Sequence, residues 1–246
     1  MIKELLTKLN MKGALEVLES IDQIKERNEF LIALLKSEIE YKELRANTRR
    51  LVQAKFPTEK EWRDLDPTLN PSIEFSKIEK LNNGLFIQKK ENLCLMGQQG
   101  TGKTHSLVAL GRDLCRRGKN VRFYTASALV NALEEAKANY TLTKLMQSLV
   151  KMDLLIIDEL GFVPLSESQA RLLFDVFAGR YEKGSIAVST NLSFDKWVKI
   201  FVSPELTAAL IDRYTHKCLI HNFEGQSVRL LRAKQRKEEL KVASAS

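Results

Sequence analysis

A glycine-rich stretch at residues 95–107, LMGQQGTGKTHSL, carries the clearest chemistry in this sequence. It matches the pattern G-x-x-x-x-G-K-[ST] with Gly97, Gly102, Lys103 and Thr104, and Gly100 adds a further glycine. In such a loop, backbone N–H groups cradle nucleotide phosphates, the lysine reaches the β- and γ-phosphates, and the hydroxyl binds Mg²⁺. The expected phosphate-binding residues are Gly97, Gln98, Gln99, Gly100, Thr101, Gly102, Lys103, Thr104 and His105.

Two adjacent carboxylates follow an apolar run farther along the chain. Asp158 and Glu159 come directly after Leu154–Ile157, which places them at the carboxyl end of a buried strand. Ligands bind at that edge in open α/β sheets. We expect Asp158 to join Thr104 in binding Mg²⁺ and Glu159 to polarise an attacking water as a general base. Since a small-molecule kinase must keep water away from its phosphoryl group, this pair favours a hydrolase of nucleoside triphosphates.

Two further residues are candidates for sensing the γ-phosphate. Asn191 follows a strand-like run at the same sheet edge and could orient the water, although asparagine there is also a common turn or cap residue. Arg213, in LTAALIDRYTHKC, could reach the nucleotide of a neighbouring subunit as an arginine finger. A local pair with Asp212 is equally compatible with the residues alone.

The elements that must position these residues alternate between strand and helix. The pattern predicts strands at 92–96, 120–126, 153–160 and 185–191. Helices are expected at 105–118 and 166–184, and one or two helices at 127–152. Near-continuous apolar strands that alternate with helices indicate an α/β fold, with a parallel sheet covered by helices on both faces.

The first 56 residues have a different texture. They contain no proline, a single glycine at Gly13, and apolar residues at helical spacing, which predicts a helical domain. Pro57, Pro67 and Pro71 then mark a connecting segment. We expect an N-terminal helical domain at 1–70, for oligomer and partner contacts, and a nucleotide-hydrolysing domain with a short basic C-terminal tail at 71–246.

The bulk composition indicates the class of protein. Hydrophobic residues make up 44% of the chain and charged residues 28%, as in ordinary globular proteins. Apolar runs are far shorter than the roughly 20 residues that a membrane-spanning helix needs, so we expect a cytoplasmic protein without membrane contact. Three scattered cysteines favour neither structural zinc nor disulfides. The net charge of +8 fits a polyanionic partner or a solvated basic surface equally well.

The order of these motifs resembles the IstB family, the AAA+ helper ATPases encoded beside the transposase of certain bacterial insertion sequences. More distantly, it is similar to the bacterial helicase loader DnaC. The motifs that narrow the choice are AKFP at 54–57, GTGKTH at 100–105 and LIDR at 210–213. The resemblance implies an AAA+ (ASCE) P-loop sheet in which the Asn191 strand lies between the Gly97 and Asp158 strands. It also implies ATP and Mg²⁺ as cofactors.

The resemblance also implies an activity. Members of this family assemble as homo-oligomers on duplex DNA with ATP sites between subunits, bend the DNA, and deliver it to a transposase that stimulates ATP hydrolysis. By position, Lys103, Glu159, Asn191 and Arg213 become the catalytic residues, and Arg229 in GQSVRL becomes a second sensor. The alternatives are a helicase loader that holds single-stranded DNA and, from another class, a small-molecule kinase.

Several features depart from the family or extend it. Gln98 and Gln99 replace two usual prolines, which puts the stiffness of the loop in question. The short remainder after Arg232 leaves no room for a C-terminal helical lid, so we expect the N-terminal domain or a neighbouring subunit to close the site. DNA is expected to be bound chiefly through its phosphates, with the protein on the nucleoid when active. The candidate DNA contacts are Lys137, Tyr140, Thr141, Lys144, Ser166 and Arg171.

Overall fold

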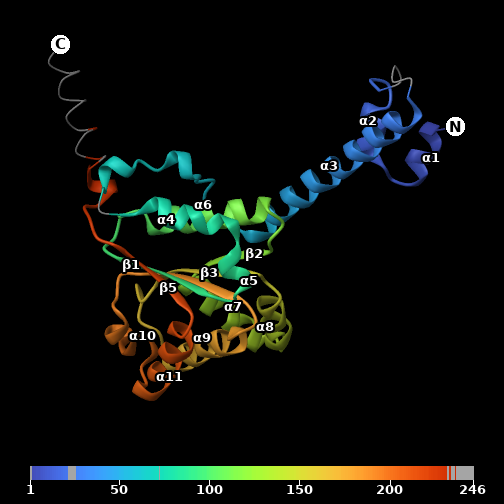
Figure 1. Ribbon diagram of the computed structural model, residues 1–246. Helices are drawn as coiled ribbons and strands as arrows, with labels where there is room; N and C mark the ends of the chain where they lie inside the picture. Colours follow the sequence, from blue (N-terminus) through green and yellow to red (C-terminus); the bar gives the residue numbers. More distant parts are fainter. Residues whose placement is uncertain (1, 22–25, 72, 232, 234–235, 237–246) are drawn as a thin grey trace, which may run out of the picture. The chain divides into compact units, whose positions relative to one another are not determined.

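The computed structural model describes residues 2–21, 26–71, 73–231, 233 and 236 of the 246-residue chain (Figure 1). The chain forms two compact units, residues 1–52 and 53–246. The expected boundary between residues 70 and 71 differs from this division, because 53–70 groups with the second unit. The assignment of partner contacts to 1–70 stays a prediction, and most of the basic tail lies outside the described residues.

The first unit is helical, as expected. It contains α1 (Ile2–Lys8), α2 (Lys12–Val17) and most of α3 (Arg27–Ala54). Leu6, Ala14 and Leu34 form a small core, and the carboxylate of buried Glu38 accepts a hydrogen bond from the Ala14 N–H at 3.1 Å. Several other apolar residues of α3 are about half exposed or more, among them Leu31, Leu35, Ile39 and Leu44.

A parallel sheet organises the second unit. Its strands are β1 (Asn92–Gly97), β2 (Val121–Thr125), β3 (Leu154–Leu160), β4 (Ser185–Thr190) and β5 (Cys218–Phe223). All neighbouring pairs are parallel and their order is β2-β3-β4-β1-β5. The strand that precedes Asn191 therefore lies between the Gly97 and Asp158 strands, which confirms the predicted order.

The edge strand β5 was absent from the sequence prediction. Its sequence, CLIHNF, mixes apolar and polar residues, and Phe223 is its one fully buried member. Since β5 pairs only with β1, its outer edge needs none of the continuous apolar pattern that marks the central strands.

Helices cover both faces of the sheet (Figure 1). One face is covered by α4 (Phe75–Glu79) and α6 (Lys103–Arg116). The opposite face is covered by the helices from α7 to α11. The expected region 127–152 forms two helices, and the helix expected to end near Gly184 ends at Arg180. The second side contains α7 (Ala126–Ala138), α8 (Leu142–Val150), α9 (Glu167–Arg180), η4 (Phe194–Trp197), α10 (Val198–Phe201) and α11 (Pro204–Thr215).

Packing on the two faces has different causes. On one face, the side chains of Leu155, Ile157, Ile186 and Val188 belong to a large core cluster shared with α7, α9, α10 and α11. On the other face, Gly111 lets α6 approach its neighbours, because a Cβ there would lie 2.7 Å from the Phe56 ring and 2.9 Å from Ile156.

Between α3 and β1 the chain forms short turns and helices: η1 (Trp62–Asp64), η2 (Pro67–Leu69), α4, η3 (Lys80–Asn83) and α5 (Leu85–Gln88). Of these, η1, α4 and η3 pack on α6. The Glu61 carbonyl lies 2.7 Å from Nε2 of His105, and the Glu61 carboxylate pairs with Arg116 and Arg112. Arg116 holds the pKa of Glu61 below its usual value, chiefly through their hydrogen bond. These bonds attach 53–70 to the second unit.

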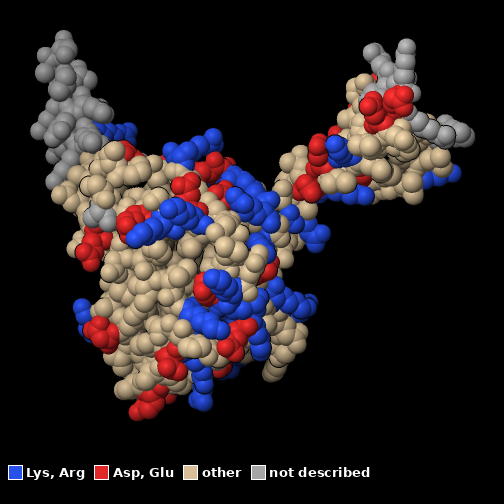
Figure 2. Space-filling model, viewed as in Figure 1, with Lys and Arg blue, Asp and Glu red and all other residues tan. Residues whose placement is uncertain are grey.

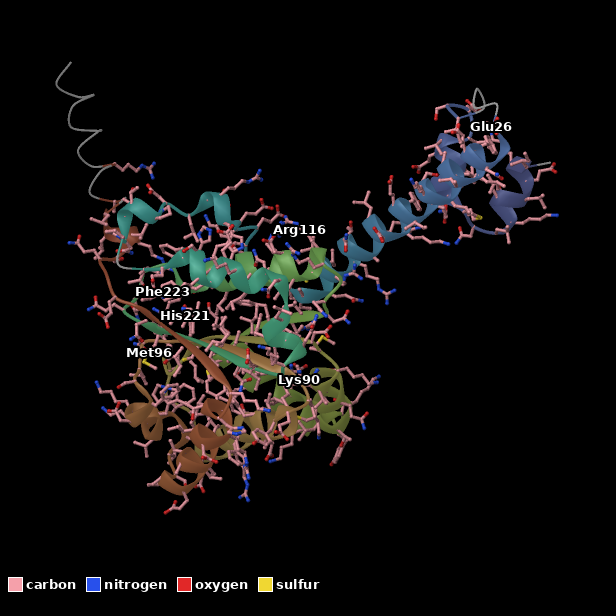
Figure 3. All side chains as sticks on the ribbon, in the orientation of Figure 1. Glu26, Lys90, Met96, Arg116, His221 and Phe223 are labelled. Carbon is pink, nitrogen blue, oxygen red and sulfur yellow. The ribbon has the colours of Figure 1, made fainter. Side chains whose placement is uncertain are left out.

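The direction of the strands defines two edges of the sheet. Figure 3 labels Met96 and Phe223 near the carboxyl ends of β1 and β5, and Lys90, which precedes β1, near the opposite edge.

The buried thiols of Cys94 and Cys115 are free. In the part of the chain that the structure describes, no helix is long and apolar enough to cross a membrane.

Candidate nucleotide-binding site

The glycine-rich loop connects β1 to α6, as the motif requires. Gly97 has φ +145° and Gly100 has φ +77°, conformations that side-chain-bearing residues rarely adopt. A Cβ at Gly97 would lie 2.2 Å from the Phe223 carbonyl oxygen, and one at Gly100 would lie 2.2 Å from Oγ of Ser227. The glycines therefore allow β5 and the segment after it to lie directly against the loop.

Lys103 begins α6 and its side chain turns back toward the loop. Its Nζ donates hydrogen bonds to the carbonyl oxygens of Gly97 at 2.7 Å and Gln98 at 2.5 Å. Burial lowers the pKa of Lys103 to about 8; Asp158 opposes this shift and Arg229 adds to it. Because this ammonium group is poorly solvated, replacing its hydrogen bonds to the loop carbonyls by contacts to negatively charged phosphate oxygens would stabilise its charge.

Asp158 and Thr104 meet beneath the loop. The Thr104 hydroxyl donates to Oδ1 of Asp158 at 3.1 Å, and the Ser189 hydroxyl donates to the same oxygen. Asp158 is 2% exposed, so its carboxylate is held by hydroxyl groups rather than by water. A carboxylate and a hydroxyl in contact are the hard oxygen ligands that Mg²⁺ prefers, so this pair fits the expected metal site.

Glu159 has an unusual backbone. Its φ is +60°, and the pairing of β3 with β4 shifts register between Ile157 and Leu160. The Glu159 N–H donates to Oγ of Ser189 at 3.0 Å. As a result the Asp158 side chain is buried while the neighbouring Glu159 side chain is exposed at a cavity.

A cavity of about 340 Å³ joins most of the expected residues, a volume within the usual range for small-ligand sites. Asn191, which is exposed, contributes to its wall together with Glu159. Thr190 fixes the turn before Asn191, because its hydroxyl donates to the Leu160 carbonyl and accepts from the Leu192 N–H. The lining residues that the sequence predicted are Gln99, Gly100, Thr101, Gly102, Lys103, Thr104, His105, Glu159, Asn191 and Arg229.

Other lining residues were missed by the sequence analysis. They come from the residues before β1, from the turn after β3, from β4 and from the residues after β5, and no spacing relates them to the glycine loop. A buried-strand pattern in which the apolar run at 186–188 is followed by a serine was a signal that could have drawn attention to Ser189. The missed residues are Thr58, Lys60, Asp64, Leu65, Asp66, Phe75, Phe162, Ser189, Thr190 and Val228.

The segment after β5 closes one side of the loop. The Val228 N–H donates to the Gly100 carbonyl at 2.9 Å, and Nδ2 of Asn70 donates to the Gln226 carbonyl at 3.0 Å. Arg229 is exposed and lines the cavity next to this contact. The connecting segment and the C-terminal segment therefore meet around the glycine loop within one unit.

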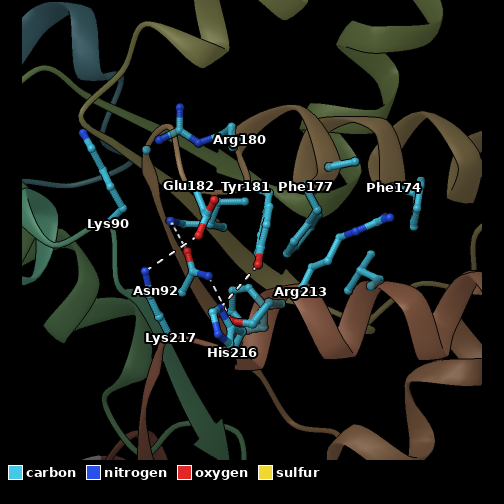
Figure 4. A pocket seen from close by; sticks show the side chains of 15 residues that line it. Lys90, Asn92, Phe174, Phe177, Arg180, Tyr181, Glu182, Arg213, His216 and Lys217 are labelled. Atoms are coloured by element: carbon cyan, nitrogen blue, oxygen red, sulfur yellow. Dashed lines mark hydrogen bonds and ion pairs between the residues drawn. The ribbon is translucent and has the colours of Figure 1, made fainter.

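Arg213 lies elsewhere. It lines a separate pocket of about 20 Å³ with residues that precede β1, β4 and β5, including Lys90, Gly184 and Lys217 (Figure 4). Its guanidinium carbon lies 5.7 Å from the centre of the Phe174 ring. This pocket is at the amino ends of the strands, so the structure does not bring Arg213 together with Lys103 and Glu159 in the same subunit.

The candidate DNA contacts lie on or next to three helices: Lys137 on α7, Lys144 and the N-cap residue Thr141 at α8, and Arg171 and the N-cap residue Ser166 at α9. Tyr140 is 98% exposed in the turn between α7 and α8, and Ser166 caps the start of α9 by accepting from the Gln169 N–H. A hydrogen bond of 3.0 Å from Gln169 to Glu134 connects α9 to α7. Ser166 thus has a structural role, whereas the side chains of Lys137, Lys144 and Arg171 are exposed.

Comparison with known proteins identifies the family. A family model described as IstB-like ATP binding protein matches residues 5–238. The chain belongs to this family. An ATP-binding protein of insertion sequence IS5376 from Geobacillus stearothermophilus is 38% identical over 212 residues, covering 86% of this chain and 84% of the relative. Its counterpart from insertion sequence IS21 of Pseudomonas aeruginosa is 34% identical over 82% of this chain and 76% of the relative.

Solved structures agree with the fold of this IstB-like protein. AMPPCP-bound DnaA from Aquifex aeolicus has a TM-score of 0.58 at 18% identity, covering 75% of this chain and 56% of that one. The DnaC helicase loader has a TM-score of 0.50 at 19% identity, covering 71% and 99%. These similarities confirm the AAA+ P-loop fold. The match to the IstB-like ATP binding protein family supports ATP binding by this chain.

Proposed function

We propose that this IstB-like protein hydrolyses ATP to ADP and phosphate with the help of Mg²⁺. The observation that carries the proposal is the convergence of Lys103, the Thr104–Asp158 pair and Glu159 at one sheet edge. Lys103 binds the β- and γ-phosphates, and Glu159 accepts a proton from the attacking water. Mg²⁺, held by Thr104 and Asp158, supplies positive charge for the phosphate oxygens.

We also propose that a second copy of the chain completes this site by supplying its Arg213. Arg213 lies at the amino ends of the strands, whereas the cavity lies at their carboxyl ends. Within its own subunit Arg213 therefore cannot stabilise charge on the γ-phosphate. A head-to-tail oligomer would place Arg213 of one subunit at the cavity of the next, where Asn191 and Arg229 respond to the same phosphates.

We further propose that ATP-driven assembly occurs on duplex DNA and serves a transposase. Insertion sequences encode the relatives named above, which supports this context. The net charge of +8 is compatible with contacts to DNA phosphates. Basic side chains gather around the part of the second unit where Lys90 and Arg116 lie (Figures 2 and 3), in addition to the candidates on α7 to α9. The protein would then act in the cytoplasm, on the nucleoid, and bend its target.

A DNA-binding experiment tests this role. The full chain is mixed with labelled duplex or single-stranded DNA, with and without ATP and Mg²⁺, and binding and particle size are followed by gel shift and sedimentation. We expect large assemblies on duplex DNA that require ATP. A preference for single strands would instead favour a helicase loader, in line with the fold of DnaC. A monomer indifferent to DNA would contradict both functions.

A further inference from the structure

A single hydroxyl group connects the two acidic residues of the site. Ser189 on β4 is 2% exposed, and its O–H donates to Oδ1 of Asp158. The Ser189 hydroxyl oxygen itself accepts a hydrogen bond from the Glu159 N–H at 3.0 Å. A hydroxyl group has one proton and two lone pairs. The Ser189 hydroxyl gives its proton to the carboxylate of Asp158, the metal-binding residue, and uses a lone pair to accept from the N–H of Glu159, the proposed general base.

The backbone of Glu159 depends on this contact. A non-glycine residue at φ +60° lies in a sparsely populated backbone conformation and persists only where its surroundings hold it. Ladder pairing between β3 and β4 skips from Ile157 to Leu160, so it gives Glu159 no pairing of its own in the sheet. The Ser189 hydroxyl instead accepts the Glu159 N–H, which fixes the peptide plane before this residue.

We infer that Ser189 is a positioning residue for ATP hydrolysis, which rests on the hydrolytic function proposed above. It holds the Asp158–Glu159 peptide in the bulged conformation that directs one carboxylate to Mg²⁺ and the other into the cavity. Without the hydroxyl, the Glu159 N–H loses its acceptor and Asp158 loses a donor. Glu159 then relaxes away from the water that it must activate, while the phosphate loop remains intact.

The consequence for kinetics is specific. Lys103 donates its hydrogen bonds to the Gly97 and Gln98 carbonyls and not to Ser189, so we expect the loss of the Ser189 hydroxyl to affect the chemical step more than ATP binding. A misplaced general base lowers kcat, and a shift of about 1 Å costs up to about a hundredfold. We expect Ser189→Ala to reduce kcat by about tenfold to a hundredfold and to leave KM for ATP within about twofold.

Strand β4 supplies a matched control. Ser185 starts the same strand and is fully buried, but its hydroxyl has no hydrogen-bond partner in the structure. Ser185→Ala removes the same group from the far end of β4 and is expected to keep kcat. Ser189→Thr retains a hydroxyl at the bridging position and is expected to restore most of the activity.

The experiment compares these three variants with the wild type as full chains. Steady-state ATP hydrolysis gives kcat and KM, a fluorescent ATP analogue gives binding, and thermal melting confirms folding. Lower kcat in Ser189→Ala with normal binding and rescue by threonine supports the inference. Unchanged kcat, an equal loss in Ser185→Ala, a loss confined to ATP binding, or a folded threonine variant without rescue overturns it. If the wild type does not hydrolyse ATP, the proposed function itself is wrong.

Discussion

Glu159 and Lys103 are functional candidates for opposite physical reasons. Glu159 is exposed at the cavity, where its carboxylate can reach a water molecule. Lys103 is 9% exposed and is bonded to carbonyl groups of its own loop. The types of both residues were predictable, because they belong to short motifs. The left-handed backbone of Glu159 and its bond to Ser189 were not, since they arise from pairing between strands distant in sequence.

Replacement of Glu159 by glutamine tests its role as a base. Glutamine has nearly the same shape but cannot accept the proton, so Glu159→Gln should bind ATP normally and hydrolyse it about a hundredfold more slowly or worse. The measurement is single-turnover hydrolysis together with equilibrium ATP binding. Glu135→Gln, on an exposed position of α7, is the control. Normal turnover in Glu159→Gln would rule out this role.

The lowered pKa of Lys103 predicts a pH effect on ATP binding. In the empty protein the amine loses its proton as pH rises through about 8, whereas phosphate oxygens favour the protonated form. ATP binding should therefore take up a proton above pH 8, and affinity should fall as pH increases further. Titration calorimetry in buffers of different ionisation enthalpy measures this uptake. Affinity that is independent of pH, with no proton uptake, would contradict the expectation.

At the scale of elements, the site depends on how β5 and the connecting segment approach the glycine loop. The existence of strands β1 to β4 was predicted from their apolar sequences, and the position of β4 between β1 and β3 was implied by the family resemblance. The positions of β5 and of residues 58–75 were not predicted, because an edge strand and a proline-rich segment carry little periodic pattern. Their role became visible through contacts such as Val228 with Gly100 and Asn70 with Gln226.

Gly97→Ala tests this close approach. The new methyl group would meet the Phe223 carbonyl at 2.2 Å in a backbone conformation unfavourable for alanine, so the loop or β5 must shift. We expect a loss of stability of about 1–3 kcal/mol and weaker ATP binding, measured by denaturant unfolding and analogue fluorescence. Gly179→Ala in helix α9 is the control, because the nearest atom to the new methyl group would be 3.9 Å away, in the side chain of Val150. Equal behaviour of the two variants would refute the argument.

For the whole molecule, the separation of Arg213 from the cavity is the decisive arrangement. A single subunit contains the phosphate loop, the metal-binding pair and the base at one sheet edge, and Arg213 at the other. Sequence reasoning alone could not choose between an arginine finger and a pair with Asp212. The structure places the guanidinium beside Phe174 instead, on the surface of α9.

Mixing of two inactive variants tests whether Arg213 acts across subunits. Arg213→Ala should retain ATP binding but lose hydrolysis, because the residue does not line its own cavity. Added Glu159→Gln protein, which cannot hydrolyse ATP but carries Arg213, should restore activity in mixed assemblies. The control partner carries both substitutions and should not. If no mixture exceeds the activity of either variant alone, Arg213 does not act in trans.

The hydrogen bond from the Val228 N–H to the Gly100 carbonyl also has a consequence for the stability of the second unit. Val228 and Arg229 thereby line the nucleotide cavity near the end of the described chain, and residues between 58 and 75, before β1, line it as well. A bound nucleotide would touch both. ATP would thereby act as a non-covalent cross-link between the two ends of this unit, and an empty site would leave the protein's least periodic segments with their weakest support.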